Sequence, residues 1–116
     1  MSDTSVCVEM NKDGKWNGLK IDEDYDGRKF EGLYENNKKN GLGKYTWADG
    51  SSYEGNYKDG KRHGYGIYRW SNGGFWLGNW KDHNKDGTGL ELIKGILYVS
   101  TFTDGVETKK TKVEME

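Results

Sequence analysis

A five-residue pattern recurs in this chain at a fixed distance, and this recurrence restricts the fold more than any local feature does. The pattern reads aromatic-x-Gly-x-aromatic and occupies residues 30–34, 53–57 and 76–80, so consecutive copies lie 23 residues apart. Each copy is followed at a constant offset by two glycines with one residue between them. Self-similarity at such a period is typical of an array in which each unit packs only on its neighbours.

The repeated residues predict both a structural framework and a division of the chain. The framework positions are Phe30, Gly32, Tyr34, Gly41, Gly43, Tyr53, Gly55, Tyr57, Gly64, Gly66, Trp76, Gly78, Trp80, Gly87 and Gly89. Within residues 30–97, three units are expected, at 30–52, 53–75 and 76–97. Residues 1–29 are interpreted as a degenerate N-terminal unit and residues 98–116 as a truncated C-terminal unit with a tail. Atypical end units of this kind cap a repeat array.

Alternation of side chains within each unit predicts β-strands. Phe30 and Tyr34 would face one side of a strand, and Leu33 would face the other. Residues 36–40 are predicted to form the polar loop of a hairpin, and Asp49-Gly50 is predicted to connect hairpins through a primed turn. The predicted fold is all-β: a single twisted antiparallel sheet of successive β-hairpins that forms a rod.

Glycines inside strands need a compensating contact, because each costs up to about 1 kcal/mol relative to alanine. We expect the missing side chain at Gly55, between Tyr53 and Tyr57, to leave a slot in which a ring from the neighbouring strand lies flat against the backbone. Only 32% of the residues are hydrophobic but 14% are aromatic, so the core would be shallow and lined with rings.

The combined pattern resembles the MORN repeat. Residues 53–66 match the pattern of that family almost throughout, and the resemblance covers residues 30–95 well and 7–108 loosely. It implies a twisted antiparallel sheet of hairpins. The family name refers to membrane occupation, and the repeats also occur joined to lipid kinases and histone methyltransferases. The N-terminal unit departs from the pattern, since it lacks the aromatic residues and has Lys20 in place of the second glycine.

Residues with catalytic or metal-binding chemistry are sparse. Residues 22–27 reproduce the first half of a calcium-binding EF-hand loop, but Leu33 stands where that loop requires glutamate, so Asp26-Gly27 is interpreted as a turn. His63 and His83 fall in predicted polar loops. His63 is interpreted as solvated, and His83 lies near, but not at, the loop position at which the repeat would place a matching histidine. The glycine pairs precede strands and not helices, which argues against a phosphate-binding loop. We therefore expect no enzyme activity, metal, cofactor or small-molecule substrate.

Basic residues of the predicted hairpin loops suggest a second kind of function. These residues are Lys38, Lys39, Lys61, Arg62 and Lys85. Stacked hairpins would align them into a stripe that could meet anionic lipid headgroups, and the alternative is a solvated edge that keeps the rod soluble. Nucleic acid is not expected as a partner, because five charges without aromatic residues on the same loops make a poor strand-binding surface.

Apolar residues opposite the aromatic side suggest an interface. They are Leu42, Tyr65, Ile67, Leu90 and Leu92. A thin sheet cannot bury both faces, so the stripe would bind a protein partner or a second copy, unless long neighbouring side chains cover it. The open strand edge near Tyr98 and Phe102 is a competing site of self-association.

These features favour a non-catalytic scaffold for protein binding or structural assembly over a peripheral membrane module that binds phosphoinositides through the loops. A regulatory module of an enzyme is a third class, which the length disfavours. Neither a membrane-spanning segment nor an apolar signal segment is seen in the sequence. We expect a cytoplasmic protein, with peripheral membrane or cytoskeletal association left open.

Overall fold

The computed structural model describes residues 8–10, 14–24 and 26–114 of the chain. Within these residues there are ten strands and no helix, and each strand pairs antiparallel with the next in sequence to form one sheet. The strands are β1 (Val8–Met10), β2 (Trp16–Glu23), β3 (Lys29–Glu35), β4 (Lys38–Thr46), β5 (Ser52–Lys58), β6 (Lys61–Arg69), β7 (Phe75–Lys81), β8 (Asn84–Ile93), β9 (Ile96–Thr103) and β10 (Val106–Lys112).

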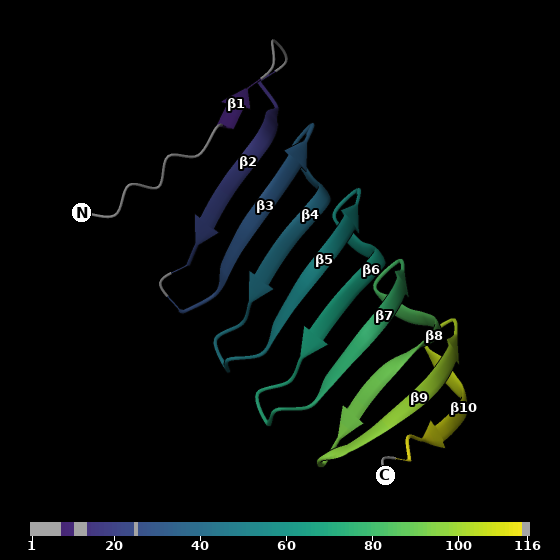
Figure 1. The fold of residues 1–116 in the computed structure, drawn as a ribbon. Coiled ribbons are helices and arrows are strands. Elements are labelled where there is room, and N and C mark those ends of the chain that lie inside the picture. Colours follow the sequence, from purple (N-terminus) through teal and green to yellow (C-terminus); the bar gives the residue numbers. More distant parts are fainter. Residues whose placement is uncertain (1–7, 11–13, 25, 115–116) are drawn as a thin grey trace.

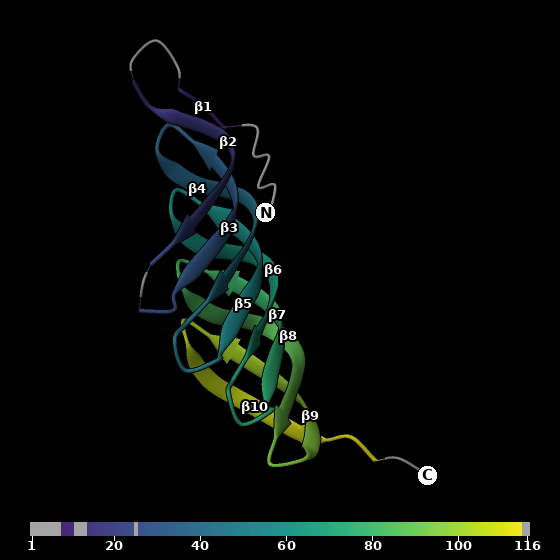
Figure 2. The same ribbon diagram turned by 90° about the vertical axis from the view of Figure 1, so that its left-hand side faces the viewer.

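The sheet is a single twisted layer, and β1 and β10 lie at its opposite ends (Figure 1). Its extents are 54 × 31 × 24 Å. The view at right angles shows that the strand direction turns progressively along the rod (Figure 2). The predicted fold class, a single twisted antiparallel sheet of successive hairpins, is confirmed.

Two-residue turns close the hairpins at one edge of the sheet. Both residues of Asn36-Asn37 have positive φ, 50° and 70°, and Asp59-Gly60 repeats this pattern with 50° and 85°. Such backbone angles belong to primed turns, whose twist matches that of the flanking strands. The predicted loop over residues 36–40 is therefore wrong in its second part, because β4 already begins at Lys38.

At the other edge, the connections between β4 and β5 and between β6 and β7 are longer and are not primed turns, whereas the β8–β9 connection is a two-residue turn, Lys94-Gly95, with positive φ of 49° and 80°. In the turn between β4 and β5 only Gly50 has positive φ, 92°, and the Trp47 amide donates to the Ser51 carbonyl oxygen at 2.9 Å. The prediction of a primed turn at Asp49-Gly50 is thus wrong. Asp49 instead shapes the turn with its side chain, which accepts hydrogen bonds from the Ser51 amide at 2.9 Å and the Ser51 hydroxyl at 2.6 Å.

Aromatic rings lying over glycines form the core. Tyr53 and Trp76 are fully buried, and Phe30 is 3% exposed. A Cβ atom built on Gly55 would lie 2.8 Å from the Tyr53 hydroxyl, so only glycine leaves room for the ring. The predicted slot is therefore present, but the ring that fills it belongs to the same strand, two residues earlier. Tyr53 also covers Gly66, which pairs with Gly55 across the sheet.

One irregularity per repeat sets where the following side chains point. Residues 55–57 of β5 face residues 62–66 of β6, so β6 carries two extra residues in this segment. Gly64, inside it, has a φ of 91°, a conformation that favours glycine. The same shift occurs between β3 and β4 and between β7 and β8. Between this irregular segment and the turn, Arg62 pairs with Tyr57, and its side chain lies on the side of the sheet that carries the rings.

Candidate functional site

The sheet presents two chemically different faces, which we call the aromatic face and the outer face. The aromatic face carries the buried ring cluster and the partly buried rings packed against it, namely Phe30, Tyr34, Tyr45, Trp47, Tyr53, Tyr57, Tyr68, Trp70, Trp76, Trp80 and Phe102. Four of the half-buried rings form a continuous row, with centroid separations of 4.6 Å from Tyr45 to Trp47, 5.2 Å from Trp47 to Tyr68, and 5.0 Å from Tyr68 to Trp70. The exposed part of each half-buried ring is an apolar surface that a ligand could contact.

One cation per repeat lies over the rings of the aromatic face. The Lys39 Nζ is 4.6 Å from the centroid of Phe30, the Arg62 Cζ is 4.6 Å from that of Trp80, and the Lys85 Nζ is 4.8 Å from that of Phe102. These distances are within the range of cation–π attraction. Lys39, Arg62 and Lys85, which we call the ring-covered cations, occur 23 residues apart.

The predicted stripe of basic loop residues is wrong. All five residues lie in strands: Lys38 and Lys39 in β4, Lys61 and Arg62 in β6, and Lys85 in β8. Because neighbouring residues of a strand point to opposite faces, Lys38 and Lys61 are exposed on the side away from the rings, while the residues that follow them are half-buried over the rings. The five charges therefore lie beside the turns of one edge but are divided between the two faces of the sheet, so they do not form one stripe.

The backbone of each ring-covered cation is tied to a turn of the next repeat. The Gly60 amide donates to the Lys39 carbonyl oxygen at 2.8 Å, and the His83 amide donates to the Arg62 carbonyl oxygen at 3.0 Å. The Arg62 amide and its Nε in turn donate to His83 Nδ1, each at 3.3 Å. Only a neutral imidazole can accept these two hydrogen bonds at Nδ1. The pKa of His83 is lowered mainly by burial and secondly by the nearby Arg62 charge, and this favours the neutral form.

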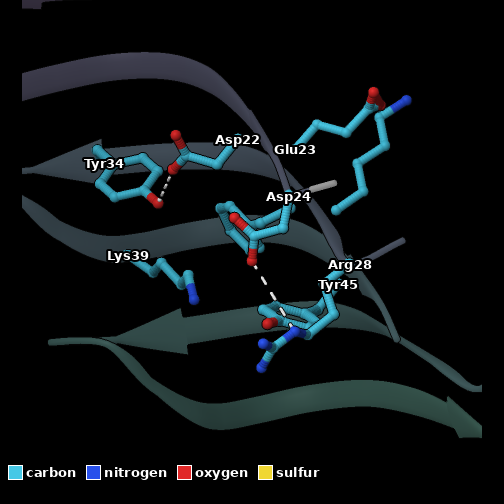
Figure 3. A pocket seen from close by; sticks show the side chains of 9 residues that line it. Asp22, Glu23, Asp24, Arg28, Tyr34, Lys39 and Tyr45 are labelled. Carbon is cyan, nitrogen blue, oxygen red and sulfur yellow. Dashed lines mark hydrogen bonds and ion pairs between the residues drawn. The ribbon is translucent and has the colours of Figure 1, made fainter. Parts of the chain in front are cut away.

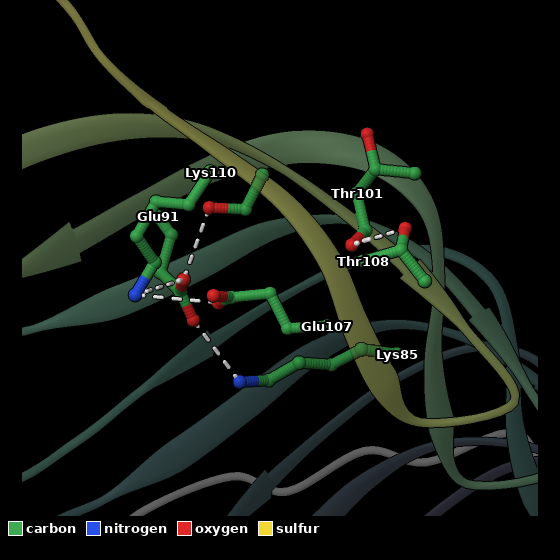
Figure 4. A network of polar contacts seen from close by, with 7 residues as sticks. Lys85, Glu91, Thr101, Glu107, Thr108 and Lys110 are labelled. Carbon is green, nitrogen blue, oxygen red and sulfur yellow. Dashed lines mark hydrogen bonds and ion pairs between the residues drawn. The ribbon is translucent and has the colours of Figure 1, made fainter.

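A buried carboxylate interrupts the ring pattern in the third repeat. Glu91 occupies the position that holds Tyr45 and Tyr68 in the first two repeats, and it is 4% exposed. It accepts hydrogen bonds from Lys85 Nζ at 3.1 Å and from the Ser100 hydroxyl at 3.2 Å, and Lys110 Nζ lies 3.8 Å away (Figure 4). Its charge is therefore compensated within the chain.

The acidic segment that resembles half of an EF-hand loop is engaged in local contacts. Asp22 accepts a hydrogen bond from the Tyr34 hydroxyl at 2.8 Å and pairs with Lys20 at 3.3 Å. Asp26 pairs with Arg28 at 2.8 Å in the turn between β2 and β3. Tyr25, within the same segment, lies outside the described residues. Among the residues that the structure describes, no group of three or more potential ligands could hold a metal ion.

An apolar patch spans four strands of the outer face. Strand pairing places Ile67, Leu77, Leu90 and Val99 in one row and Phe75, Leu92 and Leu97 in a second row beside it. We call these seven residues the outer apolar patch. Its exposed members are Leu77, Leu90 and Val99, with 38%, 36% and 39% of their surface accessible to solvent. Its contiguity makes the outer apolar patch a candidate interaction surface.

The sequence identified this patch only in part. Ile67, Leu90 and Leu92 belong to it, whereas Leu42 pairs with Asn56, and Tyr65 pairs with Asn79, outside the patch. Leu42 and Tyr65 are the most exposed of the predicted five, at 64% and 65%. Four members were not anticipated, because only the register between strands brings them together: Phe75, Leu77, Leu97 and Val99.

Two further placements differ from expectation. His63 lies in β6 and not in a loop, with Nδ1 3.7 Å from Asp82 Oδ1. Residues 96–112 form a complete hairpin, so the last unit is less truncated than predicted, and β10 is its exposed edge strand. Within the described part of the chain, no helix has the length and apolar character needed to cross a membrane.

Comparison with known families agrees with the repeat pattern. The MORN repeat model matches residues 30–52 and 53–75, which contain the hairpins β3–β4 and β5–β6. A search of curated proteins finds no significant match to the chain.

Proposed function

Because this chain contains MORN repeats, which are generally non-catalytic and are found in scaffold and binding modules, we propose that it is a scaffold that binds another protein through the outer apolar patch. The observation that carries the proposal is the contiguity of the patch across β6, β7, β8 and β9. Because the described residues form a sheet one layer thick, none of them forms a second layer over these side chains.

The chemistry of the patch favours a protein surface as its partner. Two sheets, or a sheet and a helix, pack by interlocking apolar side chains, and most domains consist of at least two such layers. The patch provides seven apolar residues for this packing, bounded by the Arg69–Glu54 pair at 3.7 Å. A partner that completes the second layer would bury the three exposed side chains and leave the charged rim in water.

Lipid binding through the basic residues is the weaker candidate. Three of the five basic residues lie over aromatic rings, and Lys85 also pairs with Glu91. A cation held in this way offers less charge to a flat membrane surface than a flexible loop lysine does. No observation in the described residues favours a headgroup over a protein ligand.

A pair of matched double variants tests the proposal. Ile67→Glu with Leu90→Glu places two charges in the patch, and Tyr65→Glu with Thr88→Glu places them two residues away on the same strands and the same face. Wild-type protein and both variants are compared by pull-down from native extract and by light scattering, with thermal melts as a control for folding.

We expect the patch variant alone to lose its captured protein or, if the partner is a second copy, its dimer mass. Dimerisation that both variants retain would place self-association elsewhere, for example at the edge strand β10. A pull-down profile and a mass that neither variant alters would refute the proposed interface.

A further inference from the structure

The ring-covered cations differ in the groups that neutralise them. Lys85 pairs with the Glu91 carboxylate at 3.1 Å. In the described ranges, the Arg62 guanidinium is bonded only to uncharged acceptors of His83, Nδ1 at 3.3 Å and the carbonyl oxygen at 3.2 Å. Among the described residues, no carboxylate lies within ion-pair distance of Lys39, although the Asp22 charge acts on it from farther away. The Lys39 ammonium lies over the rings of Phe30 and Tyr45, and Figure 3 shows it near Tyr45. Within the part of the chain that the structure describes, two of the three equivalent cations therefore have no carboxylate within ion-pair distance.

The third repeat shows which partner fits this position. Its cation is satisfied by a carboxylate at the repeat position where the first two repeats have Tyr45 and Tyr68. In those repeats a ring occupies that position, so a further carboxylate would approach the cation from outside the sheet, past the half-buried rings. Burial lowers the pKa of Lys39, and an incoming carboxylate would offset that cost of desolvation.

We propose that the aromatic face binds an acidic α-helix of a partner protein, with Lys39 and Arg62 each pairing with one carboxylate. The two cations lie in strands β4 and β6, separated by β5, which corresponds to about 10 Å across the sheet. Residues seven apart on an α-helix are about 10.5 Å apart along its axis and lie on nearly the same face. Because the two spacings agree, the site is expected to favour helices with acidic residues at positions i and i+7.

An extended peptide does not fit the same spacing. Three residues of a strand also span about 10 Å, but side chains at i and i+3 point to opposite faces, and side chains on one face recur at about 7 or 13 Å. A helix also brings apolar side chains between its two carboxylates, where Tyr45, Trp47 and Tyr68 present their rings. Hollows of about 300 Å³ beside Lys39 and about 320 Å³ beside Arg62 give room for side chains.

The charged residues around the two hollows indicate which cation is expected to bind a carboxylate more strongly. Three acidic residues, Asp22, Glu23 and Asp24, line the hollow beside Lys39. Asp22 is held by Lys20 and the Tyr34 hydroxyl, and Asp24 lies 3.8 Å from Arg28, but their charges still make this hollow less favourable to an incoming carboxylate. No acidic residue lines the hollow beside Arg62, which Lys85 and four aromatic rings share. A guanidinium also binds a carboxylate through two hydrogen bonds. Arg62 is therefore expected to provide the stronger contact.

This site lies on the face opposite the outer apolar patch, so the two proposals stand or fall separately. The test uses labelled synthetic helical peptides of identical composition, rich in alanine and leucine, with two glutamates either seven or four residues apart. Affinities are measured by fluorescence anisotropy at low salt. The peptide with seven-residue spacing is expected to bind at least about tenfold more tightly, and replacing its glutamates by glutamine should remove this advantage.

Protein variants locate the contact. Arg62→Gln should weaken binding by about tenfold or more, Arg62→Lys should retain part of it, and Lys61→Gln, a neighbour on the other face, should leave it unchanged. The patch variant Ile67→Glu with Leu90→Glu should bind the peptide like wild type. Equal affinity for both spacings, no binding of either peptide, or tighter binding of single-stranded DNA or anionic vesicles would overturn the assignment to an acidic helix.

Discussion

Placing a single methyl group at Gly66 tests whether the rings determine which strand positions must be glycine. A Cβ atom at this position would lie 2.5 Å from Tyr53 Cζ and 2.6 Å from its Cε1. Gly66 is not among the residues with positive φ, so an alanine there meets the ring without backbone strain. The substitution Gly66→Ala therefore isolates the steric contact.

The ring has little freedom to move away. Tyr53 is fully buried, its hydroxyl donates to the Asn56 carbonyl oxygen at 2.9 Å, and its ring meets Tyr57 and Trp80 edge-on at 5.3 Å. Relief of the contact needs a shift of about 1 Å, and overpacking of this kind costs about 1–3 kcal/mol. Alanine restricts the unfolded chain and returns about 0.4–1 kcal/mol. We expect a net loss of about 1.3 kcal/mol, or about 5 °C in Tm.

A double-mutant cycle gives the decisive measurement. In the background of Tyr53→Ala the ring is absent, so Gly66→Ala should cost nothing or stabilise slightly, and the coupling free energy should be about 2 kcal/mol. Thermal and urea unfolding followed by circular dichroism provide the values. A Gly66→Ala melt within a degree or two of wild type, or the same loss with and without the ring, would refute the packing argument.

Three further outcomes are expected. Trp76→Ala removes a fully buried ring and should cost about 3 kcal/mol or more, which a melt close to that of wild type would contradict. Burial and the Arg62 charge lower the pKa of His83 below 6.5, so the unfolded chain binds more protons below that pH and stability should fall as the pH drops from about 7 to 5. His83→Gln should flatten this dependence, and an unchanged slope would exclude His83 as its source. Finally, wild-type protein should not sediment with phosphoinositide-containing liposomes at low salt, and sedimentation that reversing Lys38, Lys39, Lys61 and Arg62 to glutamate abolishes without lowering the Tm would restore the lipid alternative.

The fold could be predicted from the sequence because its period and its glycines act together. A strand glycine such as Gly55 is tolerated only where a ring replaces the missing side chain, so each aromatic-x-Gly-x-aromatic segment indicates a strand and the face it buries. The constant distance between copies then indicates neighbouring strands. Both inferences depend on residues close in sequence.

The placement of the cations could not be predicted, because it depends on the length of a turn. Shortening the loop after Glu35 to two residues moves Lys38 and Lys39 into β4, and the alternation of a strand then sends them to opposite faces. The outer apolar patch could be predicted only in part, for a related reason. Phe75, Leu92 and Leu97 meet only through the register of β7, β8 and β9, which one inserted residue would change.

The twist of the sheet limits how long a rigid ligand of the aromatic face can be. Neighbouring strands rotate by about 20–25°, so each repeat of two strands turns the face by about 40–50°, and three repeats turn it by more than a right angle. A straight helix aligned with Lys39 and Arg62 has therefore diverged from the direction of the face by the third repeat. At that point Lys85 is already paired with Glu91. The rod thus offers a straight helix two charged contacts at most. Additional repeats would create further pairs of contacts at different angles, but they would not extend the existing pair.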